Sequence, residues 1–311
     1  QWLNDDGKLE GDVTVTKLEA CKFLVIVTDT MHRHAETWLK RQLDPHGDKH
    51  VMSTDVTGAY AQLNVQGPLS RQFMQALVSP EGGATSGEGD LDAEFLFSNE
   101  NFPFRAVKEV AIGYARVLCS RITYLGELGY ELYIPTDQAL HVYDRIVSLQ
   151  AEGQTKGDEA PHLHIVHGGL KALASLRMEK GYRDYGHDMD NTDTLLEMGL
   201  GFTADYTKEG GFKGQAATEA QRASMKANGG LPKRLVSIAL TESPEVMLYH
   251  GETLFRDDQC VGDVRAGSYG HTLGCSVGLA HIVPGLAKEG AVVNKKYLQE
   301  GKWEVEVAGT R

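Results

Sequence analysis

The chain has 311 residues, of which 31 are basic and 43 acidic, so its formal net charge is −12. An acidic balance of this size argues against nucleic acid or an anionic membrane as the main partner. Because the length exceeds the size at which one core keeps growing, two or three packed units are expected. No apolar run reaches the ~18 residues of a membrane span. The 4 cysteines lie far apart without metal-ligand spacing, which predicts reduced thiols in a matrix or cytosolic compartment.

Hydrophobic periodicity alternates between strand and helix along the first half of the chain. The predicted strands are 12–18, 22–28, 60–65, 115–124 and 130–134, and the predicted helices are 34–43, 68–77 and 138–150. This order favours an α+β fold, with antiparallel sheets backed by helices, over a doubly wound parallel sheet. The stretch 79–90 is rich in Gly, Ser and acidic residues and is interpreted as a surface loop.

The helical signal fades after about residue 224. Short strand-like runs follow at 234–240, 261–265, 276–282 and 303–307, and they predict a small C-terminal β-barrel or sandwich. The stretch 227–232 contains two glycines and a proline and is suited to a linker. We therefore predict domains at 1–224, with a further break near residue 54, and at 225–311.

Two carboxylates and two tyrosines are candidates for chemistry. Glu131 interrupts an apolar strand, so it must either face water or be paired with a donor. Asp12 follows Gly11 at the head of a predicted strand, where a turn cap is the simplest explanation. From the pattern alone, a solvated face is favoured for Glu131, and ordinary core is as good an account of Tyr124 and Tyr182 as a binding site.

Two segments together resemble a known family, the folate-binding aminomethyltransferases. This family includes the glycine cleavage T-protein and the C-terminal halves of dimethylglycine and sarcosine dehydrogenases. The segments contain Tyr124-Leu125-Gly126-Glu127-Leu128-Gly129-Tyr130-Glu131 and Leu176-Arg177-Met178-Glu179-Lys180-Gly181-Tyr182-Arg183. Shorter matches such as Val65-Gln66-Gly67-Pro68 extend the resemblance over nearly the whole chain, and Phe102-Pro103-Phe104 is most similar to the sarcosine dehydrogenase branch.

The resemblance implies the aminomethyltransferase folate-binding fold, followed by the barrel, and a role for each of five residues. Asp12 falls on the family's functional aspartate beside the reactive nitrogens of tetrahydrofolate, where it would stabilise positive charge and accept a proton. Glu131 matches the position that accepts hydrogen bonds from the amino-pyrimidine edge of the pterin. Tyr124 and Tyr182 match aromatic positions of the folate cavity, and Thr28 replaces a folate-adjacent asparagine of the T-protein.

The implied function is a tetrahydrofolate-binding one-carbon transfer domain of a sarcosine dehydrogenase-like flavoenzyme. It would capture the oxidised N-methyl carbon, as iminium or formaldehyde, in 5,10-methylenetetrahydrofolate. FAD would be bound by an upstream domain, because this chain has no glycine-rich dinucleotide fingerprint. The start without methionine fits a folate domain that is incomplete at its N-terminus. The resemblance also implies the mitochondrial matrix, or the cytoplasm for a bacterial protein.

Three alternatives stay open. Dimethylglycine dehydrogenase is one. A glycine cleavage aminomethyltransferase is another, although Leu173 stands where the T-protein has an arginine for the folate tail. The third is a non-catalytic member resembling the regulatory subunit of pyruvate dehydrogenase phosphatase, although Asp12 and Glu131 are both present.

No metal site is expected, since the histidines at 162, 164 and 167 lack a ligand motif. The polar run 187–193 could bring carboxylates to a cavity mouth, but we interpret it as a solvated loop.

Overall fold

The computed structural model describes residues 1–43, 50–78 and 93–311. The chain divides into two compact units: unit 1 comprises Gln1–Asp48 and Ala174–Arg311, and unit 2 comprises Lys49–Leu173. The predicted loop at 79–90 lies outside the described residues. In the described ranges, no helix is long and apolar enough to cross a membrane.

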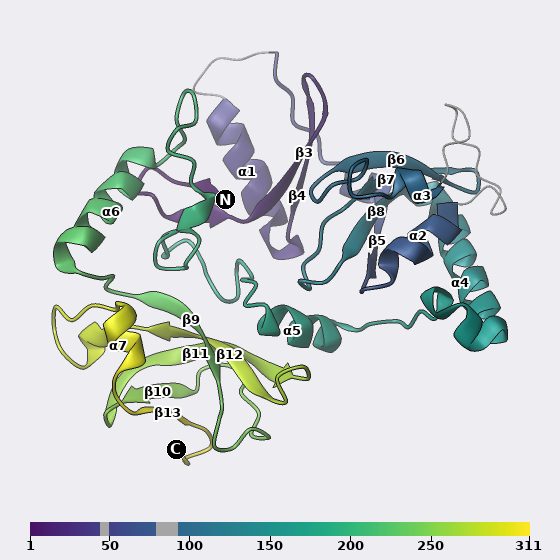
Figure 1. Cartoon of the computed structure of the whole chain (residues 1–311). Helices are drawn as coiled ribbons and strands as arrows, with labels where there is room; N and C mark the ends of the chain where they lie inside the picture. The colour runs from purple at the N-terminus through teal and green to yellow at the C-terminus, as the bar shows by residue number, and fades with distance from the viewer. Residues whose placement is uncertain (44–49, 79–92) are drawn as a thin grey trace. The chain divides into compact units, whose positions relative to one another are not determined.

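Unit 2 is built on a four-stranded antiparallel sheet with the strand order β5-β8-β7-β6 (Figure 1). Its strands are β5 (Tyr60–Gln66), β6 (Val107–Ile112), β7 (Ala115–Ser120) and β8 (Gly129–Pro135). Its helices are α2 (Ser70–Val78), α3 (Ala93–Leu96) and α4 (Ala139–Lys156), with 3-10 turns at Thr57–Ala59, Thr136–Gln138, Gly157–Glu159 and Pro161–Leu163.

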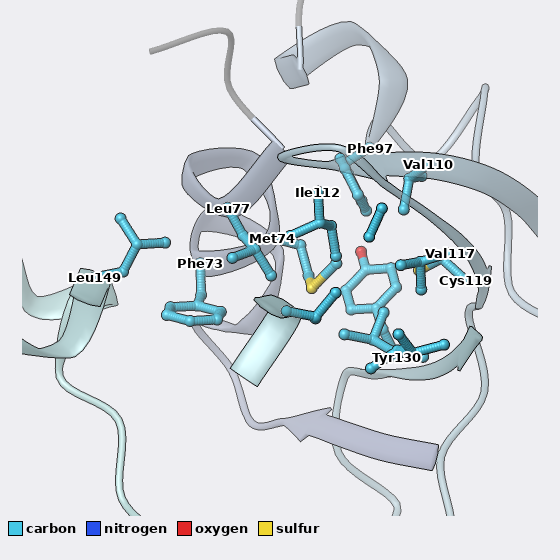
Figure 2. Packing of buried hydrophobic residues seen from close by; sticks show 14 of the residues in the cluster. Phe73, Met74, Leu77, Phe97, Val110, Ile112, Val117, Cys119, Tyr130 and Leu149 are labelled. Atoms are coloured by element: carbon cyan, nitrogen blue, oxygen red, sulfur yellow. The ribbon is translucent and has the colours of Figure 1, made fainter. Parts of the chain in front are cut away.

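The core of unit 2 lies against one face of this sheet (Figure 2). Tyr130, Leu132 and Ile134 alternate along β8 and are fully buried, together with side chains from α2 and α4. Because successive residues of a strand point to opposite faces, the residues between these three lie on the other side of the sheet. The sheet therefore has one core face and one face that is free to carry polar groups.

The predicted strand at 115–124 is too long, and the correction moves Tyr124 into a loop. β7 ends at Ser120, and its pairing with β8 ends where Ser120 lies opposite Glu131. Beyond it, Arg121 donates its backbone N–H to the carbonyl of Ala106 at 2.9 Å. This bond continues the pairing on the β6 side for one residue beyond the last pair with β8, and Tyr124 lies in the connection between β7 and β8.

Unit 1 contains three antiparallel sheets. The two small ones are β1 (Trp2–Leu3) with β2 (Leu9–Gly11), and β3 (Val13–Glu19) with β4 (Lys22–Val27). The third has the order β13-β10-β11-β12-β9, from β9 (Arg234–Ala239), β10 (Thr253–Arg256), β11 (Gln259–Gly270), β12 (Cys275–Ile282) and β13 (Trp303–Glu306). The helices are α1 (His32–Leu43), α6 (Gln215–Asn228) and α7 (Lys295–Gln299), with 3-10 turns at Asp29–Met31, Gly201–Thr203 and Pro284–Leu286. Helix α5 (Leu170–Glu179) begins in unit 2 and ends in unit 1.

These elements confirm the predicted α+β class, with antiparallel sheets and helices followed by a C-terminal sheet domain. The predicted strands 12–18, 22–28 and 60–65 agree with β3, β4 and β5 within a residue or two. Helices α5 and α6 were not predicted. Thr218 is the one buried residue of α6, and Met225 is its one apolar side chain larger than alanine, so no row of large apolar residues marks this helix. It runs past residue 224 and ends at Gly229, which adopts the left-handed conformation. The division into 1–224 and 225–311 stays a prediction.

The alternation of β8 predicts the effect of shortening its core side chains. Leu132→Ala should reduce the stability of unit 2 by about 2–5 kcal/mol, because it leaves a cavity in a closely packed interior. Native-state hydrogen exchange at unit 2 amides measures this loss. As a control, Leu140→Ala removes a side chain that is 71% exposed and should change stability by less than about 0.5 kcal/mol. Equal effects of the two substitutions would contradict the assignment of the core face.

Candidate functional site

Glu131 lies on the face of β8 opposite to the core. It is half-buried and pairs across the sheet with Asn64 of β5 and Ser120 of β7. The hydroxyl of Tyr133, two residues along the same face, donates a hydrogen bond to the Oε2 atom of Glu131. Burial raises the pKa of Glu131, and this hydrogen bond lowers it. The carboxylate is therefore held by a specific donor and is not simply solvated.

The surroundings of Glu131 on this face are polar. Gln62 and Asn64 of β5 are exposed, and the Nε2 atom of Gln62 donates to the Oδ1 atom of Asn64 at 3.3 Å. Tyr124 is half-buried in the loop that leads into β8. In this loop the backbone N–H of Leu125 donates to the Oγ1 atom of Thr123 at 3.1 Å. Unit 2 thus presents a carboxylate beside neutral hydrogen-bonding groups, and it places one predicted aromatic residue in the adjoining loop.

Asp12 and Thr28 are brought together within unit 1. Asp12 separates β2 from β3, Thr28 follows β4 directly, and Val13 pairs with Val27. The two predicted site residues therefore lie at the same end of the β3–β4 hairpin, and both are half-buried.

The electrostatics around Asp12 favour its protonated form. Burial is the main cause that raises the pKa of its carboxyl group, and the carboxylate of Asp184 acts in the same direction. Hydrogen bonds from the Gln1 side chain and the Val13 backbone oppose the rise. Burial likewise raises the pKa of Asp184, against the lowering effect of Arg177. A carboxylate whose pKa is raised can accept a proton closer to neutral pH, as a general base requires.

Tyr182 is fixed at the end of α5. Gly181 adopts the left-handed conformation with φ of 65°, which ends the helix, and Tyr182 donates its backbone N–H to the carbonyl of Arg177 at 3.0 Å. The Nη1 atom of Arg177 in turn donates to the carbonyl of Tyr182 at 2.9 Å. Two hydrogen bonds therefore hold the backbone of Tyr182, whose ring is half-buried.

A buried ion pair anchors the turn that follows. Arg177 is 5% exposed and donates through both terminal nitrogens to Asp188, which is fully buried. Asp188 also accepts the backbone N–H of Asp184 at 2.8 Å. The pair thus fixes the turn that carries Asp184, whose carboxylate acts on Asp12. Sequence reasoning missed this pair, although an arginine in the apolar run of α5 is the signal that could have found it.

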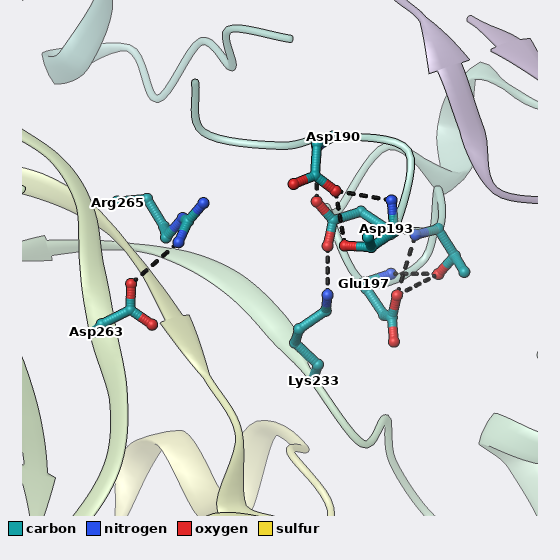
Figure 3. Close-up of polar contacts among 8 residues, drawn as sticks. Asp190, Asp193, Glu197, Lys233, Asp263 and Arg265 are labelled. Atoms are coloured by element: carbon teal, nitrogen blue, oxygen red, sulfur yellow. Dashed lines mark hydrogen bonds and ion pairs between the residues drawn. The ribbon is translucent and has the colours of Figure 1, made fainter. Parts of the chain in front are cut away.

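The interpretation of 187–193 as a solvated loop is wrong for two of its carboxylates. Asp188 is buried against Arg177, and Asp193 is buried in an ion pair with Lys233 (Figure 3). Asp193 also accepts the backbone N–H of Asp190 at 2.8 Å. Asp188 fastens the segment to α5, and Asp193 fastens it to Lys233, the residue before β9, so the role of both is structural.

Two of the three histidines considered as metal ligands, His164 and His167, contact hydrogen-bonding groups of unit 2. The Nε2 atom of His164 contacts the carbonyl of Gly153 at 3.0 Å, and that of His167 contacts the hydroxyl of Tyr143 at 3.1 Å. Across the ranges that the structure describes, no group of three or more His, Cys, Asp or Glu residues could hold a metal ion.

The buried ion pair predicts a large effect of removing one partner. Arg177→Met should destabilise unit 1 by about 3–5 kcal/mol, because the buried carboxylate of Asp188 loses its arginine and keeps a side-chain contact with the Nδ1 atom of His187 at 3.1 Å. All three tryptophans, Trp2, Trp38 and Trp303, lie in unit 1, so fluorescence during denaturant unfolding reports this loss. Arg116→Met, which breaks the exposed pair with Glu109, should cost less than about 1 kcal/mol in unit 2, measured by hydrogen exchange. A small loss for Arg177→Met would contradict the structural role.

The raised pKa of Asp12 predicts that Asp12→Asn stabilises unit 1 at neutral pH. A carboxyl group whose pKa is higher in the folded state contributes stability below its unfolded pKa, and this contribution is lost as the pH rises through the folded pKa. The variant should therefore unfold at higher denaturant concentration than wild type at pH 7, and the difference should disappear in acid. A variant that is less stable than wild type at pH 7 would contradict this environment for Asp12.

Comparisons with known proteins agree with these features. Residues 1–208 match the sequence model described as the GCVT N-terminal domain, and residues 233–311 match the glycine cleavage T-protein C-terminal barrel domain. The fold is similar to the crystal structure of glycine cleavage system aminomethyltransferase T from Bartonella henselae. The TM-score is 0.65 at 18% identity, covering 90% of this chain and 66% of that one.

Several curated proteins are similar over nearly the whole chain. 4-Methylaminobutanoate oxidase (formaldehyde-forming) of Paenarthrobacter nicotinovorans is 35% identical, covering 91% of this chain and 30% of that protein. Mitochondrial sarcosine dehydrogenase of Mus musculus is 30% identical, covering 99% of this chain and 31% of that protein. The mitochondrial pyruvate dehydrogenase phosphatase regulatory subunit of Mus musculus is 28% identical, covering 99% of this chain and 32% of that protein. The chain thus spans about a third of the length of these relatives. It belongs to the glycine cleavage T-protein family, with the GCVT N-terminal domain followed by the family's C-terminal barrel domain.

Proposed function

We propose that this chain binds tetrahydrofolate and transfers a one-carbon unit to it. The observation that carries the proposal is the half-buried carboxylate of Glu131, held by Tyr133 on the non-core face of the unit 2 sheet. Membership of the T-protein family supports the same function, because the resemblance of the sequence implies folate binding.

Glu131 fits the amino-pyrimidine edge of a pterin. That edge presents adjacent N–H donors, and a carboxylate can accept two of them in parallel. Tyr133 occupies one acceptor position of Oε2, which leaves further lone pairs on both oxygens for a ligand. Half-burial strengthens such bonds, since the local dielectric is lower than that of water. Tyr124, in the loop before β8, is proposed to contact the flat face of the ligand.

Asp12 fits the transfer step. Tetrahydrofolate supplies a ring nitrogen that takes up the one-carbon unit, and this nitrogen must lose a proton. Asp12 is proposed to stabilise the positive charge and accept the proton, a role for which burial raises its pKa in the useful direction. Thr28 lies at the same end of the hairpin, and Tyr182 is proposed as a further aromatic contact of the ligand.

We further propose that the carbon comes from an oxidised N-methyl amine, as in a sarcosine dehydrogenase-like flavoenzyme. The carbon would arrive as iminium or formaldehyde and leave as 5,10-methylenetetrahydrofolate. Two relatives support this source by name, an oxidase that forms formaldehyde and a sarcosine dehydrogenase. An upstream FAD domain would perform the oxidation. Dimethylglycine is the alternative substrate, and the proposed compartment is the mitochondrial matrix, or the cytoplasm for a bacterial protein.

Two other functions have specific support. The regulatory subunit of pyruvate dehydrogenase phosphatase is similar over 99% of the chain, which favours a non-catalytic role as the second candidate. An aminomethyltransferase of Clostridium botulinum is 29% identical, and the chain covers 70% of its length. A glycine cleavage activity would require transfer from a carrier-bound aminomethyl group, and the leucine at position 173 speaks against it.

The test is calorimetric titration of tetrahydrofolate into the full-length protein. Wild type should bind saturably, and Glu131→Gln should weaken binding by about 1.5–3 kcal/mol, the worth of a hydrogen bond to a charged group. Glu109→Gln, on the exposed end of the same sheet, is the matched control and should bind like wild type. Asp12→Asn should bind tetrahydrofolate without forming 5,10-methylenetetrahydrofolate. Absence of binding by wild type would overturn the proposal and favour the regulatory role.

A further inference from the structure

We propose that Tyr133 is a positioning residue, whose hydroxyl fixes the Glu131 carboxylate so that it can accept paired N–H donors from a ring ligand. The inference rests on the proposed function and extends it to a residue for which the sequence predicted no role. Tyr133 would act through Glu131 and would not itself bind the ligand.

The geometry on β8 supports this role. Glu131 and Tyr133 are two residues apart, so their side chains lie on the same face, and the hydroxyl donates to Oε2. Tyr133 is 5% exposed, and its cross-strand neighbours are Gln62 on β5 and Leu118 on β7. A tyrosine ring has few torsions, and packing holds this one in place. The position of its hydroxyl is therefore set by the sheet, and the hydroxyl in turn sets the carboxylate.

The neighbouring strands offer Glu131 no charged partner at the paired positions. Asn64 on β5 and Ser120 on β7 lie directly opposite it, and both are neutral. Arg116, further along β7, is bonded to Glu109 of β6 at 3.0 Å.

Other ionisable groups lie on β5 and in the connection before β8, which also carries Tyr124. Tyr60 lies at the far end of β5, opposite Pro135. In the connection before β8, Arg121 donates to the carbonyl of Phe102, and Glu127 carries a like charge. The Tyr133 hydroxyl is thus the donor that opposes the effect of burial on Glu131.

This arrangement links Tyr133 to the pH dependence of binding. The ligand needs the ionised form of Glu131, because a protonated carboxyl group loses acceptor capacity. Affinity should therefore fall as the pH falls through the pKa of Glu131. Removal of the hydroxyl removes a contribution that lowers this pKa, so the fall should begin at a higher pH. A residue that merely fills space would not shift this midpoint.

The experiment compares Tyr133→Phe with wild type in the full-length protein. Tetrahydrofolate binding is measured by calorimetry at a series of pH values between about pH 5 and pH 8. A carboxyl group with a raised pKa changes its protonation state in or near this range. We expect the variant to bind about tenfold more weakly at neutral pH, or about 1.4 kcal/mol, and its pH midpoint to move upward. The matched control is Tyr130→Phe on the same strand, because the Tyr130 hydroxyl is buried on the core face and has no hydrogen-bond partner among the described residues. That control should match wild type in both readouts.

The outcomes separate this inference from the proposed function. If wild type binds and Glu131→Gln does not, while Tyr133→Phe matches wild type in affinity and midpoint, the positioning role is overturned and the folate site stands. A uniform loss of affinity for Tyr133→Phe with an unchanged midpoint would also overturn it, because it would indicate a structural role alone. If wild type does not bind, the proposed function fails first.

Discussion

The account of unit 2 depends on one constraint: residues of β8 alternate between the core face and the polar face of the sheet. Three large apolar side chains on one face secure the strand to the core, so the intervening residues must lie on the other face. The same alternation that gives the unit its stability therefore presents Glu131 and Tyr133 together. The placement of the carboxylate is not an independent feature of the fold, because a slip of one residue in the register would bury it.

Unit 1 also carries a half-buried carboxylate, but no strand alternation of this kind places it. There the half-buried group is Asp12, and its environment depends on a turn held by the buried pair of Arg177 and Asp188. A buried ion pair contributes little net stability compared with apolar packing, but it tolerates few alternative geometries. In unit 2 the half-buried carboxylate is held by the buried Tyr133, and in unit 1 it accepts hydrogen bonds from Gln1 and Val13. Such carboxylates have raised pKa values, which suits residues that exchange protons or accept N–H donors.

Much of the fold was predictable from periodicity, because many strands alternate and the first helices are amphipathic. Strand β6 and helices α5 and α6 were not predicted, and Met225 is the one apolar side chain larger than alanine in α6. The strand predicted at 115–124 was too long, because β7 ends at Ser120. The candidate site residues were predicted from a family resemblance, but the residues that hold them in place were not predicted. Asp188 and Asp193 gain their roles from contacts with Arg177 and Lys233, which the sequence does not place beside them. Tyr133 shares a strand face with Glu131, but strand alternation alone does not predict the hydrogen bond between them.

The central claim is that the polar face of the unit 2 sheet binds a pterin through Glu131. The most direct measurement is a crystal structure of the full-length protein with tetrahydrofolate bound. The account predicts both Glu131 oxygens within hydrogen-bond distance of the amino-pyrimidine N–H groups, at about 2.7–2.9 Å, with the Tyr133 hydroxyl still bonded to Oε2. A ligand bound away from this face, with Glu131 in contact with Tyr133 alone, would contradict the account.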